Sequence, residues 1–366
     1  VALAARDDVD CVIEVIGGSD GPAKATVERA IQGGRDVVTA NKALIAHHGQ
    51  ALAEAAEAAG TALAAEAAVA GGIPALRGLG EGLSANRITR VFGVLNGTCN
   101  FILSEMTARG APYAAVLEEA QRLGYAEADP AFDVGGIDAA HKLAILASLA
   151  FGTRVDIDAV VAEGIERVSP EDIATARDMG LAIRLLGLAQ VTETGLEQRV
   201  RPVMVSADTV IGSLPGVTNA VVVEGASIGQ VTLTGPGAGA GPTASAIMAD
   251  VIACARGHRA PLFGRPAATL VAATPLPHGD EHAPYYLRVM LVDAPGMLAR
   301  LATAIGAEGV SIQRMHQYDG APGAKAVPVV LITHDAPRAA VDAAIAGIEA
   351  GGFCDGAPVA MRIETV

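Results

Sequence analysis

The stretch DCVIEVIGGSDGPAKATVERAIQGGRDVVTANK, residues 10–42, decides the fold of the first part of the chain. It opens with a short apolar, β-branched run that ends at two glycines, a pattern typical of a buried strand. A helical pattern follows over residues 22–32, with Pro22 at its start and two glycines as its stop. DVVTANK is then a second buried strand. This order predicts two parallel strands joined by a crossover helix.

The same alternation continues downstream. Residues 44–59 have a helical pattern that Gly60 stops, and residues 61–69, TALAAEAAV, are a third strand candidate despite their alanines. Alternating strands and helices indicate an α/β fold with a doubly wound parallel sheet over residues 1–70.

The middle of the chain, residues 71–275, has a mixed α+β pattern. In ITRVFGVLNGTCNFIL, residues 88–103, we expect a strand with a turn at Asn96–Gly97. A hairpin is expected around Gly225. Helices are expected over residues 112–123, 138–151, 170–187 and 242–257, the last of them packing back on the first domain.

The C-terminal part follows a proline-rich stretch, so residues 276–284 are predicted to be a linker. Residues 285–366 then show strand, helix, strand, strand, helix and strand in turn. That order predicts a ferredoxin-like domain.

Composition and charge exclude several classes of protein. Lys and Arg number 26 against 40 Asp and Glu, a net charge of −14, and aromatic residues make up only 3%. Both features argue against binding of nucleic acid or an anionic membrane. There is no long apolar run and Val1–Arg6 does not resemble a signal peptide, so we expect a cytoplasmic protein that does not enter membranes. The four cysteines are far apart, which favours reduced, buried thiols.

The segment AQRLGYAEADPAFDVGGIDAAHK, residues 120–142, concentrates the side chains that could perform chemistry. Asp138 and Lys142 are four residues apart, so they share a helix face. The helix continues as LAILASLAF, which is apolar on every side and therefore predicted to be buried. A buried lysine next to a carboxylate is a candidate acid/base group. A plain salt bridge at a helix start is the alternative.

This segment closely resembles the signature of the homoserine dehydrogenase family. The resemblance extends over residues 1–275, through GGSDGPA, TANKALIAHHG, EAAVAGGIP, LNGTCNFIL and GPGAGAGPTASA. Residues 293–312, DAPGMLARLATAIGAEGVSI, resemble an ACT domain, a regulatory module that binds small molecules. The signature positions matched are Ala120, Gly124, Tyr125, Asp129, Pro130, Asp133, Gly136, Asp138 and Lys142.

The resemblance implies a role for each catalytic candidate. Lys142 would be the acid/base group, while Asp138 would orient the substrate hydroxyl and Glu127 would bind the substrate amino group. Lys42, just after a parallel strand, is a second candidate for proton transfer, although a surface lysine is the alternative. The implied reaction interconverts L-aspartate 4-semialdehyde and L-homoserine in threonine, methionine and isoleucine biosynthesis.

Ligand sites are implied in the same way. NAD or NADP would contact Gly17, Lys42, Gly124 and Gly239, although Ala240 departs from the glycine usual in the family. Main-chain carbonyls would bind a monovalent cation of the sodium type, Na⁺, at a site that suits hard cations. The residues implied for the cation are Glu66, Val69, Gly71 and Ile73.

The resemblance also sets expectations for the first domain and for partners. Residues 1–70 would be a truncated Rossmann-type domain that lacks its first strands and glycine-rich loop, roughly 70–90 residues. The choice between NAD and NADP therefore stays open. Residues 71–275 would bind substrate and form a homodimer or homotetramer, and the ACT domain would bind threonine as an effector. A catalytically impaired protein that senses amino acids through its ACT domain is the alternative function.

Overall fold

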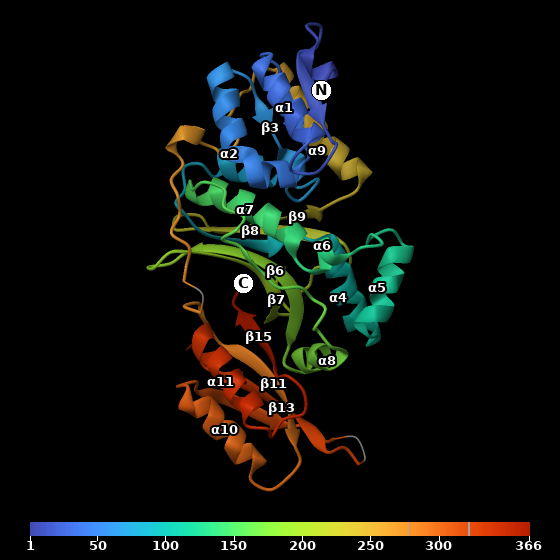
Figure 1. Cartoon of the computed structure of the whole chain (residues 1–366), viewed down its shortest axis with the longest axis vertical. Coiled ribbons are helices and arrows are strands. Elements are labelled where there is room, and N and C mark those ends of the chain that lie inside the picture. The colour runs from blue at the N-terminus through green and yellow to red at the C-terminus, as the bar shows by residue number, and fades with distance from the viewer. Residues whose placement is uncertain (278, 321–322) are drawn as a thin grey trace. The chain divides into compact units, whose positions relative to one another are not determined.

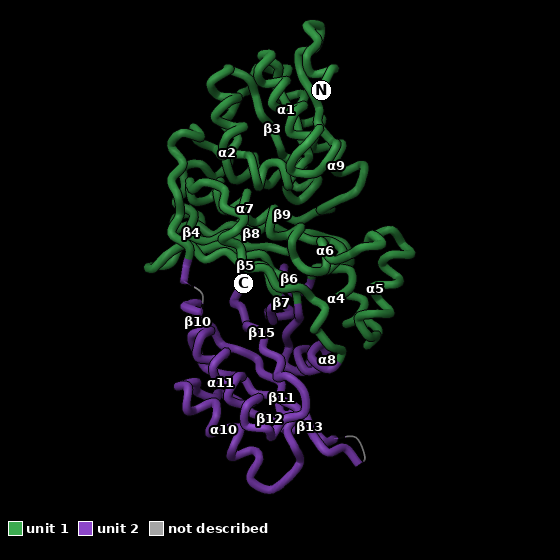
Figure 2. Tube along the Cα trace, viewed as in Figure 1, with its two compact units in different colours: residues 1–170, 184–201, 214–275 green, residues 171–183, 202–213, 276–366 purple. Residues whose placement is uncertain are grey.

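The computed structural model describes residues 1–277, 279–320 and 323–366 (Figure 1). The chain forms two compact units (Figure 2). Unit 1 comprises residues 1–170, 184–201 and 214–275, and unit 2 comprises residues 171–183, 202–213 and 276–366. In the described part of the chain, no helix is long and apolar enough to cross a membrane.

A three-stranded parallel sheet in the order β1-β2-β3 opens unit 1, which confirms the predicted α/β pattern. Its apolar core joins both helices to the sheet, through Val27 and Leu44 against Val12 and Val37. The elements are η1 (Leu3–Ala5), β1 (Cys11–Glu14), α1 (Pro22–Gln32), β2 (Asp36–Thr39), α2 (Lys42–Ala59) and β3 (Leu63–Ala64).

The third strand is shorter than predicted. Only Leu63–Ala64 pairs with β2, and Glu66–Ala68 form the 3-10 turn η2. The Glu66 carboxylate accepts the backbone N–H groups of Leu76 and Arg77, which draws the chain away from the sheet. Alanine also has a low strand propensity, so these alanines do little to favour a longer strand over the turn.

The rest of unit 1 is a mostly antiparallel sheet with helices beside it, to which β5 adds a parallel pairing with β7. In the described residues β4 pairs with β6 and β8, and β8 and β9 form the predicted hairpin. Helix α9 packs on the first sheet, through Ile247 and Cys254 against Val38. The elements are α3 (Ala75–Arg77), the π-helical η3 (Gly78–Gly82), β4 (Ile88–Val94), α4 (Gly97–Arg109), α5 (Tyr113–Arg122), α6 (Ala131–Val134), α7 (Ile137–Phe151), β5 (Val161–Ala162), β6 (Leu181–Val191), β7 (Leu196–Ser206), β8 (Thr218–Gly225), β9 (Gly229–Pro236), α9 (Ala240–Ala255) and η4 (Ala267–Thr269).

Two predicted elements of this region are wrong. The turn at Asn96–Gly97 begins a helix, α4, because the Asn96 side chain accepts the N–H of Cys99 as an N-cap. The helix predicted over residues 170–187 ends at Asp178. Gly180 has φ 72°, and the following apolar residues join the sheet as β6, since pairing and burial there outweigh their helical periodicity.

Unit 2 contains the predicted ferredoxin-like domain, with its strands in the order β12-β13-β11-β15. β15 also pairs in parallel with residues 203–205 of β7. The predicted linker holds β10, and its residue 278 lies outside the described residues. The elements are α8 (Pro170–Asp178), β10 (His282–Ala283), β11 (Tyr285–Val292), α10 (Met297–Ala307), β12 (Ile312–Gln317), β13 (Ala326–Thr333), β14 (Ala336–Pro337), α11 (Arg338–Ala350) and β15 (Val359–Glu364).

Candidate active site

A cavity of about 580 Å³ in unit 1 brings together most of the predicted site residues. Its wall is formed by the end of β2, the turn after η2, the β4–α4 junction, the loop before α6, helix α7 and the loop between β9 and α9. The predicted residues in this wall are Lys42, Gly71, Gly124, Glu127, Asp138, Lys142 and Gly239.

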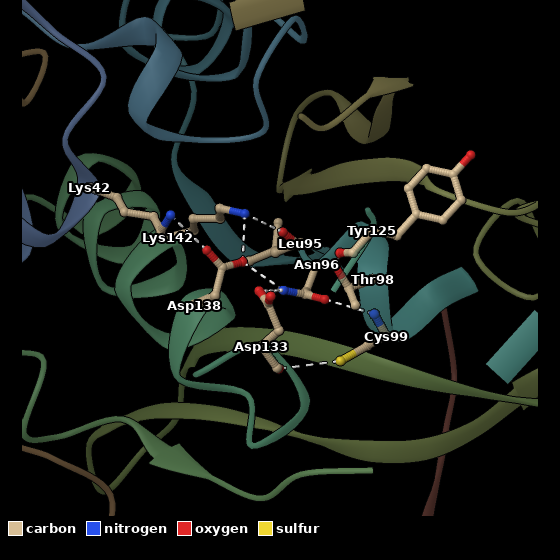
Figure 3. Close-up of polar contacts among 9 residues, drawn as sticks. All are labelled: Lys42, Leu95, Asn96, Thr98, Cys99, Tyr125, Asp133, Asp138 and Lys142. Carbon is tan, nitrogen blue, oxygen red and sulfur yellow. Dashed lines mark hydrogen bonds and ion pairs between the residues drawn. The ribbon is translucent and has the colours of Figure 1, made fainter. Parts of the chain in front are cut away.

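Asp138 and Lys142 lie side by side on the first turns of α7, as their spacing predicts. Lys142 Nζ donates to Asp138 Oδ2 at 2.7 Å and to the carbonyl of Leu95 at 2.8 Å (Figure 3). Lys42, which begins α2, lies 2.9 Å from the other oxygen of Asp138. One carboxylate therefore bridges two ammonium groups contributed by separate helices.

Burial and charge act in opposite directions on Asp138. Burial raises the pKa of this carboxyl, but the positive charges of Lys142 and Lys42 outweigh it, so the pKa lies well below its usual range. Asp138 is thus held ionised at neutral pH. The side chain of Lys142 is 10% exposed and that of Lys42 is 32% exposed, so Lys42 is the more accessible of the two ammonium groups.

Asn96 ties this cluster to a second carboxylate. Its Nδ2 donates to Asp138 Oδ2 and to Asp133 Oδ1, each at 2.8 Å (Figure 3). Burial raises the pKa of Asp133, and the hydrogen bond from Asn96 partly offsets this. The sequence analysis did not select Asn96 as a site residue. An asparagine between an apolar strand and a helix is the N-cap signal that could have identified it.

The start of α4 faces the same cavity. Gly97 and Thr98 are in its wall, and neither backbone N–H has a hydrogen-bond partner among the described residues. Thr98 Oγ1 donates to the carbonyl of Tyr125 at 2.6 Å. Free N–H groups at the start of a 13-residue helix suit an anionic group. Sequence analysis missed Thr98 because it expected only a turn there.

Gly17 does not reach this cavity. It follows β1, is exposed, and its N–H donates to the Glu14 carboxylate at 3.2 Å. The same carboxylate accepts the N–H of Ile16 and the hydroxyl of Thr39. Glu14 thereby fixes the loop after β1 to the end of β2. Carboxyl ends of parallel strands are where ligands bind in open α/β sheets.

The residues predicted for the cation lie on a tightly turned segment. Ala70 has φ 56° and Gly71 has φ 54°, so two successive residues are left-handed. The carbonyls of Val69 and Gly71 accept no hydrogen bond from the described residues, whereas those of Glu66 and Ile73 each accept one. Among the described residues, no three His, Cys, Asp or Glu side chains are grouped as metal ligands. On this segment, the groups available to coordinate an ion are therefore the backbone carbonyl oxygens.

Comparison with known proteins identifies the family. The homoserine dehydrogenase NAD-binding domain matches residues 1–66, the homoserine dehydrogenase family model matches residues 74–252, and the ACT domain matches residues 285–350. A homoserine dehydrogenase of Neisseria gonorrhoeae is 43% identical over all of this chain and 85% of its own length. The chain belongs to the homoserine dehydrogenase family.

Solved structures of homoserine dehydrogenases agree. One from Thiobacillus denitrificans has a TM-score of 0.92 and 43% identity, over 98% of this chain and 83% of that one. A hyperthermophilic archaeal homoserine dehydrogenase in complex with NADPH has a TM-score of 0.59 and 28% identity, over 68% of this chain and 72% of that one. Family membership makes this chain an oxidoreductase with an NAD-binding part and an ACT domain.

Proposed function

We propose that this chain catalyses the interconversion of L-aspartate 4-semialdehyde and L-homoserine with NAD or NADP, and that Lys142 is the acid/base group. The proposal rests on the cluster in the cavity wall formed by the buried Asp138 and Lys142 and the partly exposed Lys42. When bound, the dinucleotide supplies the hydride for the aldehyde carbon. The aldehyde oxygen then needs a proton from a group within hydrogen-bond reach.

Each polar part of the substrate has a matching group in the wall. The free N–H groups of Gly97 and Thr98 suit its carboxylate, and Glu127 suits its ammonium. Asp138 holds the Lys142 ammonium in place, so that a substrate oxygen beside it receives a proton from Nζ. In the reverse direction, Lys142 takes the hydroxyl proton. Lys42 is the second donor, at the same carboxylate.

Other residues of the same cavity wall suit the dinucleotide. Lys42 follows β2, and the loop with Gly237 and Gly239 lies in the same wall. The backbone at Gly71 packs closely against the backbone at Gly237, since a Cβ on Gly71 would lie 2.5 Å from the Gly237 carbonyl oxygen. We assign Lys42, Gly124 and Gly239 of this wall to the dinucleotide, together with Gly17, which lies outside the cavity after β1.

An assay tests the proposal directly. The purified chain is expected to consume NADPH or NADH when L-aspartate 4-semialdehyde is added, with L-homoserine as product. Lys142→Met is expected to abolish most of this turnover. Absence of turnover together with threonine binding would favour the alternative, an amino-acid-sensing regulatory protein. A buried acid/base lysine in a cavity wall favours the enzyme, because a sensor does not need one.

A structural Na⁺ held by the carbonyls of Glu66, Val69, Gly71 and Ile73 is part of the proposal. The strained backbone at Ala70 supports it, because such strain persists where the surroundings or a ligand fix it. Replacement of NaCl by choline chloride is expected to lower the thermal unfolding temperature. An unchanged temperature would contradict the cation site.

The ACT domain supports an effector site, and we assign it threonine. Gly296, with φ 85°, begins α10 and leaves room for close approach to the backbone. Threonine is expected to reduce the rate, which a titration measures. The assembly we propose is a homodimer or homotetramer, measurable by light scattering, in a cytoplasmic enzyme of threonine, methionine and isoleucine biosynthesis.

A further inference from the structure

Asn219, on β8, is a buried polar residue that the proposed mechanism does not use. Its side chain is fully buried. Neither Oδ1 nor Nδ2 has a hydrogen-bond partner among the described residues. A buried polar atom without a hydrogen bond destabilises the folded state, so an amide with both atoms unpaired calls for a physical reason.

Two glycines of the cavity wall separate this amide from the cavity. A Cβ on Gly237 would fall on the carboxamide of Asn219, and a Cβ on Gly97 would lie 3.5 Å from its Oδ1. Gly97 and Gly237 both line the cavity. Asn219 therefore lies directly behind the wall, at the point where the wall has no side chains.

The peptide between Gly237 and Ala238 is confined from the other side by Gly71. A Cβ on Gly71 would lie 2.5 Å from the Gly237 oxygen and 2.9 Å from the Ala238 nitrogen. Because a Cβ on Gly237 would fall on the Asn219 carboxamide, this peptide is adjacent to Asn219, whose side chain bonds to neither its oxygen nor its N–H.

We propose that Asn219 is a positioning residue for the dinucleotide, and that its amide becomes hydrogen-bonded to the Gly237–Ala238 peptide when the dinucleotide binds. This inference rests on the proposed function only for the identity of the ligand. The unpaired amide disfavours the free state, and binding then adds a hydrogen bond that the free state lacks. The net contribution of one such bond corresponds to roughly fivefold in affinity.

Asn219→Leu tests this, because leucine keeps the volume and removes both polar atoms. Without ligand, the thermal unfolding temperature is expected to stay the same or rise, since no hydrogen bond is lost. The rise in unfolding temperature on addition of NADPH is expected to shrink, with roughly fivefold weaker binding by calorimetry. A fall in the ligand-free temperature with an unchanged NADPH effect would mean a structural amide paired with buried water, and would overturn the proposal.

Asn219→Asp provides a second readout, including the case in which the leucine variant does not fold. A protonated Asp has one donor and one acceptor, like the amide, whereas an ionised Asp only accepts. Burial raises the pKa of a carboxyl. NADPH binding by this variant is therefore expected to strengthen relative to the parent chain as pH falls from 8 to 6. A constant ratio of the two affinities would count against the proposal.

Ser104→Ala is the matched control. Ser104 Oγ is also buried without a partner in the described part of the chain, but Ser104 does not line the cavity. Its loss is expected to leave NADPH binding unchanged. If the parent chain shows no turnover but Asn219→Leu still removes the effect of NADPH on the unfolding temperature, only the proposed function is contradicted. Turnover and binding unaffected by Asn219→Leu would defeat this inference alone. Binding of neither NADPH nor NADH by the parent chain would defeat both proposals.

Discussion

The side-chain amide of Asn96 lies 2.8 Å from Oδ2 of Asp138, the oxygen that also accepts the ammonium of Lys142. The same amide nitrogen reaches Asp133, while its oxygen caps helix α4. One residue at the β4–α4 junction therefore orients two carboxylates. The orientation of Asp138 and Lys142 therefore depends on Asn96.

Asn96→Asp is expected to lower kcat by roughly 10- to 100-fold, less than the roughly 100- to 10,000-fold that loss of an acid/base group costs, because the group is misplaced and not removed. The new carboxylate would face two others, and like charges at this distance disfavour full ionisation. Kinetics between pH 6 and 9 would show the loss and a changed pH profile. Asn86→Asp, whose amide only meets the carbonyl of Leu83, is the control. Equal kinetics for both variants would contradict the role of Asn96.

Lys142→Met is expected to reduce kcat by roughly 100- to 10,000-fold, because it removes the proposed proton donor. Asp138 keeps Lys42 as a partner, so the protein should still fold. Steady-state kinetics and circular dichroism together measure this. Lys24→Met, on α1 outside the cavity wall, should retain activity. Near-normal turnover in Lys142→Met would transfer the acid/base role to another group.

The pH dependence of stability is expected to report on Asp138. The folded state holds its pKa low, so the ionised carboxylate contributes stability above its unfolded pKa of about 3.9. That contribution is lost as pH falls through the lower, folded-state pKa. The difference in unfolding free energy between the parent chain and Asp138→Asn should therefore be constant near neutrality and shrink below about pH 4.

Urea unfolding at pH 7, 5 and 3.5 would measure this difference. Asp10→Asn, at an exposed aspartate before β1, is the matched control and should show a small difference at every pH. A gap for Asp138→Asn that widens toward low pH would contradict the sign of the shift.

Gly71→Ala is expected to lower stability by roughly 1–3 kcal/mol, since alanine is strained at φ 54° and its Cβ would meet the Gly237 oxygen. The displaced Gly237–Ala238 peptide should also weaken dinucleotide binding. Chemical unfolding and calorimetry measure the two effects. Gly306→Ala, in helix α10 with open space around it, should instead be neutral or stabilising. A neutral Gly71→Ala would show that the turn adapts freely.

Local sequence patterns were sufficient to predict much of the secondary structure of this protein. The strand–helix–strand order of residues 10–42, the hairpin around Gly225 and the C-terminal ferredoxin-like order follow from periodicity and turn residues. The shared helix face of Asp138 and Lys142 follows from a spacing of four. These features depend on neighbours within a few residues, which the sequence states directly.

Tertiary structure alone decided the contacts between distant segments. It brought Lys42 from α2 to Asp138, placed Asn96 between two carboxylates, and set Asn219 behind Gly237. It also turned residues 181–187 from an expected helix into a strand, because sheet pairing and burial outweighed their periodicity. Burial, charge pairing and close backbone approach depend on which segments meet in the fold, and no local pattern specifies that.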